Sequence, residues 1–178
     1  MLGYHLLAII VILIEKQGSK GKLLFTGGSV VVVMIAFILA SFSGVILYLS
    51  SKVMNTPVNL GSILDSLGLT KSNWVIFIFY YTFINSVIEE YYWRGYLGGS
   101  GKMITVSDIC YAGYHPFVLL RFIYWPWVII EFILLVGVAW MWRMIIRKYK
   151  GLLIPVVMHL AADLTTILAI FILATNPI

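Results

Sequence analysis

Charged side chains are scarce in this chain. They make up 11% of its 178 residues, whereas apolar side chains make up 62% and the mean hydropathy is +1.02. Soluble domains carry about 25% charged residues, which cover their surface. The composition therefore excludes a soluble globular domain and predicts a membrane protein. The single cysteine, Cys110, excludes an intramolecular disulfide and a site of several thiolates, and we expect it to be a small buried side chain.

Basic runs with interleaved aromatic residues are also missing outside the apolar segments. The net charge of +5 therefore does not predict nucleic-acid binding, and we expect no nucleic-acid partner. Membrane proteins retain lysine and arginine on their cytoplasmic side, which accounts for a positive balance. The composition predicts membrane lipid as a partner, and it leaves the oligomeric state open.

Long apolar segments are what the chain has in abundance. A helix needs about 20 apolar residues to cross a hydrocarbon layer of about 30 Å. We predict an all-α fold, a polytopic membrane bundle of about six transmembrane helices. The six segments are Leu2–Ile14, Leu23–Leu49, Trp74–Trp93, Met103–Ile123, Trp127–Ile146 and Leu152–Ala174. The first covers only about 20 Å at 1.5 Å per residue, so both a span and a helix lying in the membrane interface stay open for it.

Basic residues between the segments predict the orientation in the cell membrane. If every segment spans, a larger group faces one side: Lys16, Lys20, Lys22, Arg94, Lys102, Arg143, Arg147, Lys148 and Lys150. A smaller group faces the other side: Lys52, Lys71 and Arg121. The larger group is expected to be cytoplasmic, so both termini are predicted to lie outside the cell.

Ionisable residues inside the apolar segments carry the functional information, because each costs at least about 2.5–3.5 kcal/mol in hydrocarbon. Glu89 and Glu90 lie in the third segment, His115 in the fourth, and His159 and Asp163 in the sixth. Taken singly, each has an ordinary explanation as a polar contact between helices. In the predicted orientation Glu89, His115 and His159 reach similar depths in the cytoplasmic half of the membrane. A carboxylate and two imidazoles form a general-base set, which predicts one shared, water-accessible cavity.

Helical spacing groups some of these residues further. His159 and Asp163 are four residues apart and therefore share one helix face. Glu90 and Arg94 have the same spacing, with the acid preceding the base, which favours an ion pair. In segment four, Pro116 follows His115 directly and is expected to kink the helix there.

Three motifs, in order and each on its own apolar segment, resemble those of the CPBP family, the CAAX prenyl-protease and bacteriocin-processing membrane proteins. They read Glu89-Glu90-x-x-x-Arg94, Tyr111-x-x-x-His115 and His159-x-x-x-Asp163. The resemblance covers roughly residues 73–170. It implies a catalytic helical core at 73–178, preceded by N-terminal transmembrane segments and an outer loop at 1–72.

The resemblance implies an intramembrane glutamic endopeptidase without metal or other cofactor. Its substrate would be a membrane-associated or lipidated peptide or protein. Glu89 would be the general base, assisted by His115, and the two would activate a water molecule. His159 and Asp163 would stabilise the oxyanion or position the substrate carbonyl. Glu90 and Arg94 would shape the site by pairing.

Two positions depart from the family pattern. Tyr111 replaces the usual phenylalanine, and Asp163 stands where many active members carry asparagine. An ionised carboxylate cannot donate a hydrogen bond to an oxyanion. We therefore predict that Asp163 holds His159 protonated, so that His159 is the donor.

Two alternatives to a metal-free protease stay open. Members of the same family also serve as non-catalytic bacteriocin-immunity proteins or scaffolds, and a fold can be retained without its chemistry. Alternatively, Glu89, His115 and His159 could be the three protein ligands of a hydrolytic zinc. The zinc alternative ranks third, because the chain has no His-Glu-x-x-His motif.

Overall fold

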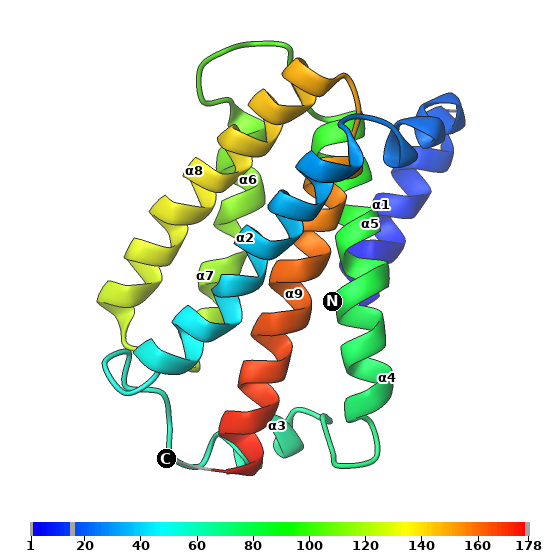
Figure 1. The fold of residues 1–178 in the computed structure, drawn as a ribbon. Helices are drawn as coiled ribbons and strands as arrows, with labels where there is room; N and C mark the ends of the chain where they lie inside the picture. The colour runs from blue at the N-terminus through cyan, green and yellow to red at the C-terminus, as the bar shows by residue number, and fades with distance from the viewer. Residues whose placement is uncertain (1, 15–16, 177–178) are drawn as a thin grey trace.

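The computed structural model describes residues 2–14 and 17–176, and in these ranges its regular elements are all helices. The α-helices are α1 (Leu2–Ile14), α2 (Val30–Ser50), α3 (Leu60–Ser66), α4 (Trp74–Phe79), α5 (Ser86–Glu89), α6 (Val106–Gly113), α7 (His115–Leu119), α8 (Trp125–Tyr149) and α9 (Leu153–Thr175). The others are the 3₁₀-helix η1 (Gln17–Phe25) and the π-helices η2 (Tyr80–Asn85) and η3 (Glu90–Tyr96). The predicted all-α bundle is confirmed (Figure 1). Lys16, one of the basic residues used to predict orientation, lies outside the described residues.

Three helices, α2, α8 and α9, are long and apolar enough to cross a membrane. Large apolar side chains on the outside of the bundle remain exposed; Phe42 on α2 is 55% exposed and Leu134 on α8 is 58% exposed. A helical bundle with such an apolar exterior is suited to a lipid environment, where the backbone groups of a spanning segment must bond within the protein. The membrane class predicted from composition is therefore confirmed.

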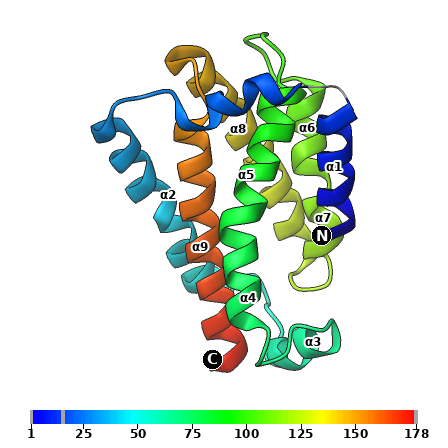
Figure 2. The ribbon, with the colours of Figure 1, turned by 90° about the vertical axis from the view of Figure 1, so that its right-hand side faces the viewer.

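The third predicted segment forms one continuous helix at 74–96, in which α4, η2, α5 and η3 follow one another without a break (Figure 2). It continues beyond the predicted end at Trp93. Two parts of it, η2 and η3, are π-helical and hold more residues per turn than an α-helix. Short π-helical turns within α-helices often occur at functional sites. No sequence pattern indicated these turns, because they depend on what the helix packs against.

The fourth predicted segment is divided into α6 and α7. Pro116 lies in the first turn of α7, where a backbone N–H has no partner within the helix, so proline costs no hydrogen bond there. α6 ends before it, at Gly113. The predicted kink beside His115 is thus a break between two short helices. α6 begins with a capping box between Thr105 and Asp108, whose side chain accepts from the Thr105 N–H at 2.8 Å.

Helix α9 lies in the middle of the bundle (Figures 1 and 2). α2 crosses it on one side, the 74–96 helix packs on another, and α8 runs alongside with α6. α1, with 13 residues, lies beside α5 and η3 and does not run the full length of the bundle (Figure 2). This packing brings the 74–96 helix, α6–α7 and α9 together, and these are the elements that carry the three motifs.

Candidate active site

Glu89 and Glu90 both lie in the interior of the bundle, at the junction of α5 and η3. Glu89 is 1% exposed and Glu90 is 0% exposed. Glu90 Oε1 accepts from Arg94 Nη1 at 3.0 Å, so the expected pair one turn apart is present. Successive residues of a regular helix point about 100° apart. Here the two glutamates nevertheless meet the same side chain of α9, His159.

His159 lies at the centre of the site, with a carboxylate near each ring nitrogen. Its Nδ1 is 2.9 Å from Glu90 Oε1. Its Nε2 is 3.5 Å from Asp163 Oδ2 and 3.8 Å from Glu89 Oε2. The spacing between His159 and Asp163 does place them on one helix face. The shortest contact of the imidazole, however, is with Glu90 instead of Asp163.

Asp163 is held by two side chains from the 74–96 helix. Asn85 Nδ2 donates to Asp163 Oδ2 at 2.9 Å, and Ser86 Oγ donates to the same oxygen at 3.1 Å. Both donors are buried. A buried carboxylate requires such partners, because an unsatisfied one is costly away from water. Asn85 and Ser86 therefore fix Asp163 beside His159 Nε2.

Tyr114, the last residue before α7, links Glu89 to His115. Its hydroxyl donates to Glu89 Oε1. Its ring stacks on the His115 ring, with centroids 4.0 Å apart and an interplanar angle of 29°. Among the described residues, no hydrogen bond or ion pair joins His115 directly to Glu89. The second Glu89 oxygen, Oε2, is buried and has no hydrogen-bond partner in this part of the chain.

His115 is only partly buried, unlike the two glutamates and His159. Its Nδ1 is 3.2 Å from the Tyr111 carbonyl oxygen. A carbonyl only accepts, so Nδ1 carries the proton and, in the neutral ring, Nε2 is left as an acceptor. His115 is thus connected to Glu89 through Tyr114, and its Nε2 is left as an acceptor.

Aromatic rings enclose the charged groups. The Arg94 guanidinium lies over the Tyr111 ring, 3.7 Å from its centroid, and 4.9 Å from the Trp142 ring. The Trp142 and His159 ring centroids are 5.1 Å apart. Cation–π contacts of this kind keep a buried guanidinium in place without further anions. Tyr111, the first residue of the second motif, is therefore a wall of the site.

A metal site was one of the open alternatives. Within residues 2–14 and 17–176, no three or more His, Cys, Asp or Glu side chains are grouped so that they could hold a metal ion. His115 in particular stacks on Tyr114 and bonds the Tyr111 carbonyl. The arrangement does not support a zinc set of Glu89, His115 and His159.

Sequence reasoning missed Tyr114, Asn85 and Ser86. Asn85 lies four positions before Glu89, and Ser86 lies four positions before Glu90. Each polar residue therefore shares a helix face with one glutamate, and this spacing could have indicated Asn85 and Ser86. Tyr114 gave no comparable signal, because tyrosine is common throughout the chain.

Cys110 was expected to be buried, and this prediction is wrong. It is exposed on α6, because the face of α6 turned toward α8 is occupied by Tyr111 and Asp108. Asp108 pairs there with Arg143 of α8 at 2.7 Å.

Fold and site together define a class: a helical membrane protein with a buried cluster of carboxylates and histidines among its helices. The family follows from the comparison with known proteins. Residues 71–165, more than half of the chain, match the family described as type II CAAX prenyl endopeptidase Rce1-like. The chain belongs to this family of CAAX-type membrane proteases, as the three motifs indicated. Comparison with curated proteins and with solved structures gives no match.

Proposed function

We propose that the chain is an intramembrane endopeptidase that hydrolyses a peptide bond of a membrane-associated or lipidated peptide or protein. The observation that carries the proposal is the pair formed by Glu89 Oε2, a buried carboxylate oxygen with no hydrogen-bond partner among the described residues, and His159 Nε2, 3.8 Å away. A base and a donor therefore lie side by side, so that both can contact the same water molecule or substrate group. The family assignment supports the same reaction class.

Glu89 is the general base in this proposal. Its Oε1 is occupied by the Tyr114 hydroxyl, so Oε2 remains to accept a proton from water. The water oxygen then attacks the scissile carbonyl carbon and forms a tetrahedral intermediate. Collapse of the intermediate breaks the C–N bond, and the proton taken up by Glu89 passes to the leaving nitrogen. The products are a carboxylic acid and an amine, which in water become a carboxylate and an ammonium group, and one water is consumed.

His159 is the oxyanion donor. Its Nδ1 is engaged with Glu90, which fixes the ring, and its Nε2 points toward Glu89 and Asp163. A fixed donor at the position where charge develops is worth about 10²–10³-fold in rate. Glu90 and Asp163 balance the charge of the imidazolium, and Arg94 in turn pairs with Glu90.

His115 is the assisting residue. It contacts Glu89 through Tyr114, and its Nε2 is left as an acceptor for the water or the substrate amide. Because His115 is partly exposed, it lies where a substrate peptide would enter. Tyr114 is a positioning residue, since it orients both Glu89 and His115.

We further propose that the active site lies in the cytoplasmic half of the membrane. Arg143, Arg147 and Lys150 line one pocket at the end of α8. There α8 meets the beginning of α9, and α9 runs from it to the opposite end of the bundle (Figure 1). Basic residues at one end favour a cytoplasmic position for that end. α1 begins part-way along the bundle (Figure 2). The position of the N-terminus outside the cell therefore stays a prediction that rests on the distribution of basic residues.

The reaction is tested with purified protein and a synthetic prenylated peptide that ends in a CAAX sequence. Mass spectrometry of the released C-terminal fragment reports the cleavage. We expect cleavage of the prenylated peptide, with activity unchanged after dialysis against a chelator. Elemental analysis should find less than one equivalent of zinc per chain. Loss of activity on chelation, restored by added Zn²⁺, would contradict the metal-free mechanism while leaving peptide hydrolysis standing.

The role of Asp163 predicts a moderate loss on Asp163→Asn. The substitution removes a negative charge 3.5 Å from His159 Nε2 but leaves Glu90 at Nδ1, so we expect about a tenfold lower kcat with little change in KM. The pH optimum should also move, because one of the charges that balance the imidazolium is lost. The measurement is the pH profile of kcat for both proteins. A rise in activity with an unmoved optimum would contradict this assignment.

A further inference from the structure

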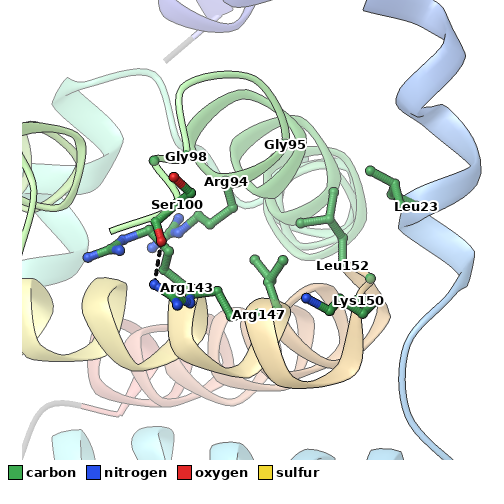
Figure 3. Close-up of a pocket in the computed structure, with 12 residues that line it drawn as sticks. Leu23, Arg94, Gly95, Gly98, Ser100, Arg143, Arg147, Lys150 and Leu152 are labelled. Atoms are coloured by element: carbon green, nitrogen blue, oxygen red, sulfur yellow. Dashed lines mark hydrogen bonds between the residues drawn. The ribbon is translucent and has the colours of Figure 1, made fainter. Parts of the chain in front are cut away.

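A pocket of about 340 Å³ lies at the end of the bundle where η3 and α8 end and α9 begins. One wall is the loop after η3, with Gly98 and Ser100; another is the last turns of α8, with Arg147 and Lys150 (Figure 3). This pocket is separate from the space between Glu89 and His159, and the catalytic proposal does not use it. Its volume and its place at the helix ends suit a ligand from the membrane interface.

The pocket carries positive charge that the protein does not neutralise. Two of the arginines that line it are paired, Arg94 with Glu90 and Arg143 with Asp108. In the part of the chain that the structure describes, no carboxylate pairs with the other two cations: Arg147 and Lys150. Arg147 donates to the Ser100 carbonyl, which holds its guanidinium beside the loop (Figure 3).

Arg94 adds a buried donor. Its side chain is 2% exposed and lines the pocket. Nη1 donates to Glu90, but Nη2 is buried and has no hydrogen-bond partner among the described residues. A buried donor without an acceptor is costly, and donors to charged acceptors form the stronger hydrogen bonds. The pocket therefore presents two uncompensated cations, Arg147 and Lys150, to an anionic oxygen, and the buried Arg94 guanidinium adds its charge from the pocket wall.

Three large apolar side chains also line the pocket. Leu23 of η1, Ile146 of α8 and Leu152 face the same space. A ligand that satisfies both parts of the lining has an anionic group next to an apolar one. Anionic phospholipids have this chemistry, and basic pockets between membrane helices at their cytoplasmic ends bind such head groups.

We propose that this pocket binds the phosphate of an anionic phospholipid head group, with Arg147 and Lys150 at the phosphate, Arg94 in the pocket wall, and Leu152 against the glycerol. Two of the lining residues, Gly98 and Gly99, have no side chain. Since Arg94 also pairs with Glu90, which contacts His159, the bound lipid stabilises the arrangement of the candidate active site from outside it.

The test uses the full chain purified in a non-ionic detergent. Phosphatidylglycerol, phosphatidylcholine or inorganic phosphate is titrated, and the readouts are the thermal midpoint and the retained lipid in native mass spectrometry. We expect phosphatidylglycerol to raise the midpoint and to be retained. Lys150→Gln should weaken this binding about fivefold, since one basic group near a lipid surface contributes about that factor.

Lys148→Gln is the matched control, because Lys148 has the same charge at the same helix end, lies over the Tyr149 ring and does not line the pocket. It should bind phosphatidylglycerol as the parent protein does. Lys150 has a left-handed backbone (φ 58°), so Lys150→Asn serves as a second variant that suits this conformation.

Three outcomes would overturn the proposal. Lys148→Gln could weaken binding as much as Lys150→Gln, which would mean general surface attraction. Phosphatidylcholine could stabilise the protein equally, which would mean that the anionic charge is not recognised. Inorganic phosphate alone could reproduce the full shift, which would mean that the site takes free phosphate instead of a lipid.

Discussion

Glu89→Gln is expected to lower the rate of peptide cleavage by about 10²–10⁴-fold, the usual contribution of a general base. Glutamine keeps the size of the side chain and can still interact with the Tyr114 hydroxyl, but it cannot take a proton from water. The effect should therefore fall on kcat, with KM and the thermal midpoint nearly unchanged. The measurement is the rate of fragment release from the prenylated peptide, compared with the thermal midpoint of the same preparation.

The matched control is Glu131→Gln on α8, which makes the same chemical change inside the same bundle and outside the site. It should keep the parent rate within about twofold. If Glu89→Gln cleaved as fast as the parent, Glu89 could not be the base. If the parent protein cleaved nothing and Glu89→Gln still protected cells in a bacteriocin-immunity assay, the non-catalytic role within the family would take the place of the protease.

Gly44→Ala is expected to destabilise the bundle by about 1–3 kcal/mol or more. A Cβ atom at Gly44 of α2 would lie 2.1 Å from the backbone oxygen of Thr165 on α9. Neither backbone can move cheaply, because Gly44 N donates to Thr165 Oγ1 at 3.3 Å and Ser43 Oγ donates to the Ala162 oxygen at 3.2 Å. Small residues at such crossings let membrane helices approach closely. The thermal midpoint in detergent should fall clearly.

Gly137→Ala provides the comparison. Gly137 lies within α8, and a Cβ atom there would meet nothing within 4 Å. The same change should leave the midpoint unchanged or raise it slightly, since alanine favours a helix over glycine by about 1 kcal/mol. Equal midpoints for Gly44→Ala and Gly137→Ala would mean that α2 does not pack on α9 as described. A displaced α9 would also lower activity, because it carries His159 and Asp163.

Features with a local cause were predictable from sequence. An irregularity of the helix beside His115 was predicted from Pro116, although as a kink and not as the break that is present. The pair of Glu90 with Arg94 follows from a spacing of one helical turn. The membrane class follows from composition, since 11% of charged residues is too little to cover the surface of a soluble domain. The motif residues could also be identified from sequence as candidate site residues, because an ionisable group in an apolar segment is costly and usually has a function.

Features that depend on the contacts between helices were not predictable. The hydrogen bond from Tyr114 to Glu89 and those from Asn85 and Ser86 to Asp163 join different helices, so they exist only once the helix faces have been paired. The π-helical turns, which bring Glu89 and Glu90 to the same histidine, depend on the same packing.

By itself the sequence determined the membrane environment, the helices and the set of charged residues that must be sheltered from lipid. These features depend on composition and on the spacing of residues along the chain. The tertiary structure alone decided which partner each of these residues has. His159 bonds to Glu90 instead of Asp163, His115 reaches Glu89 only through Tyr114, and a basic pocket opens beside Arg94. The physical reason is that hydrogen bonds and ion pairs act over a few ångströms, and only the packing of the helices sets distances of that size.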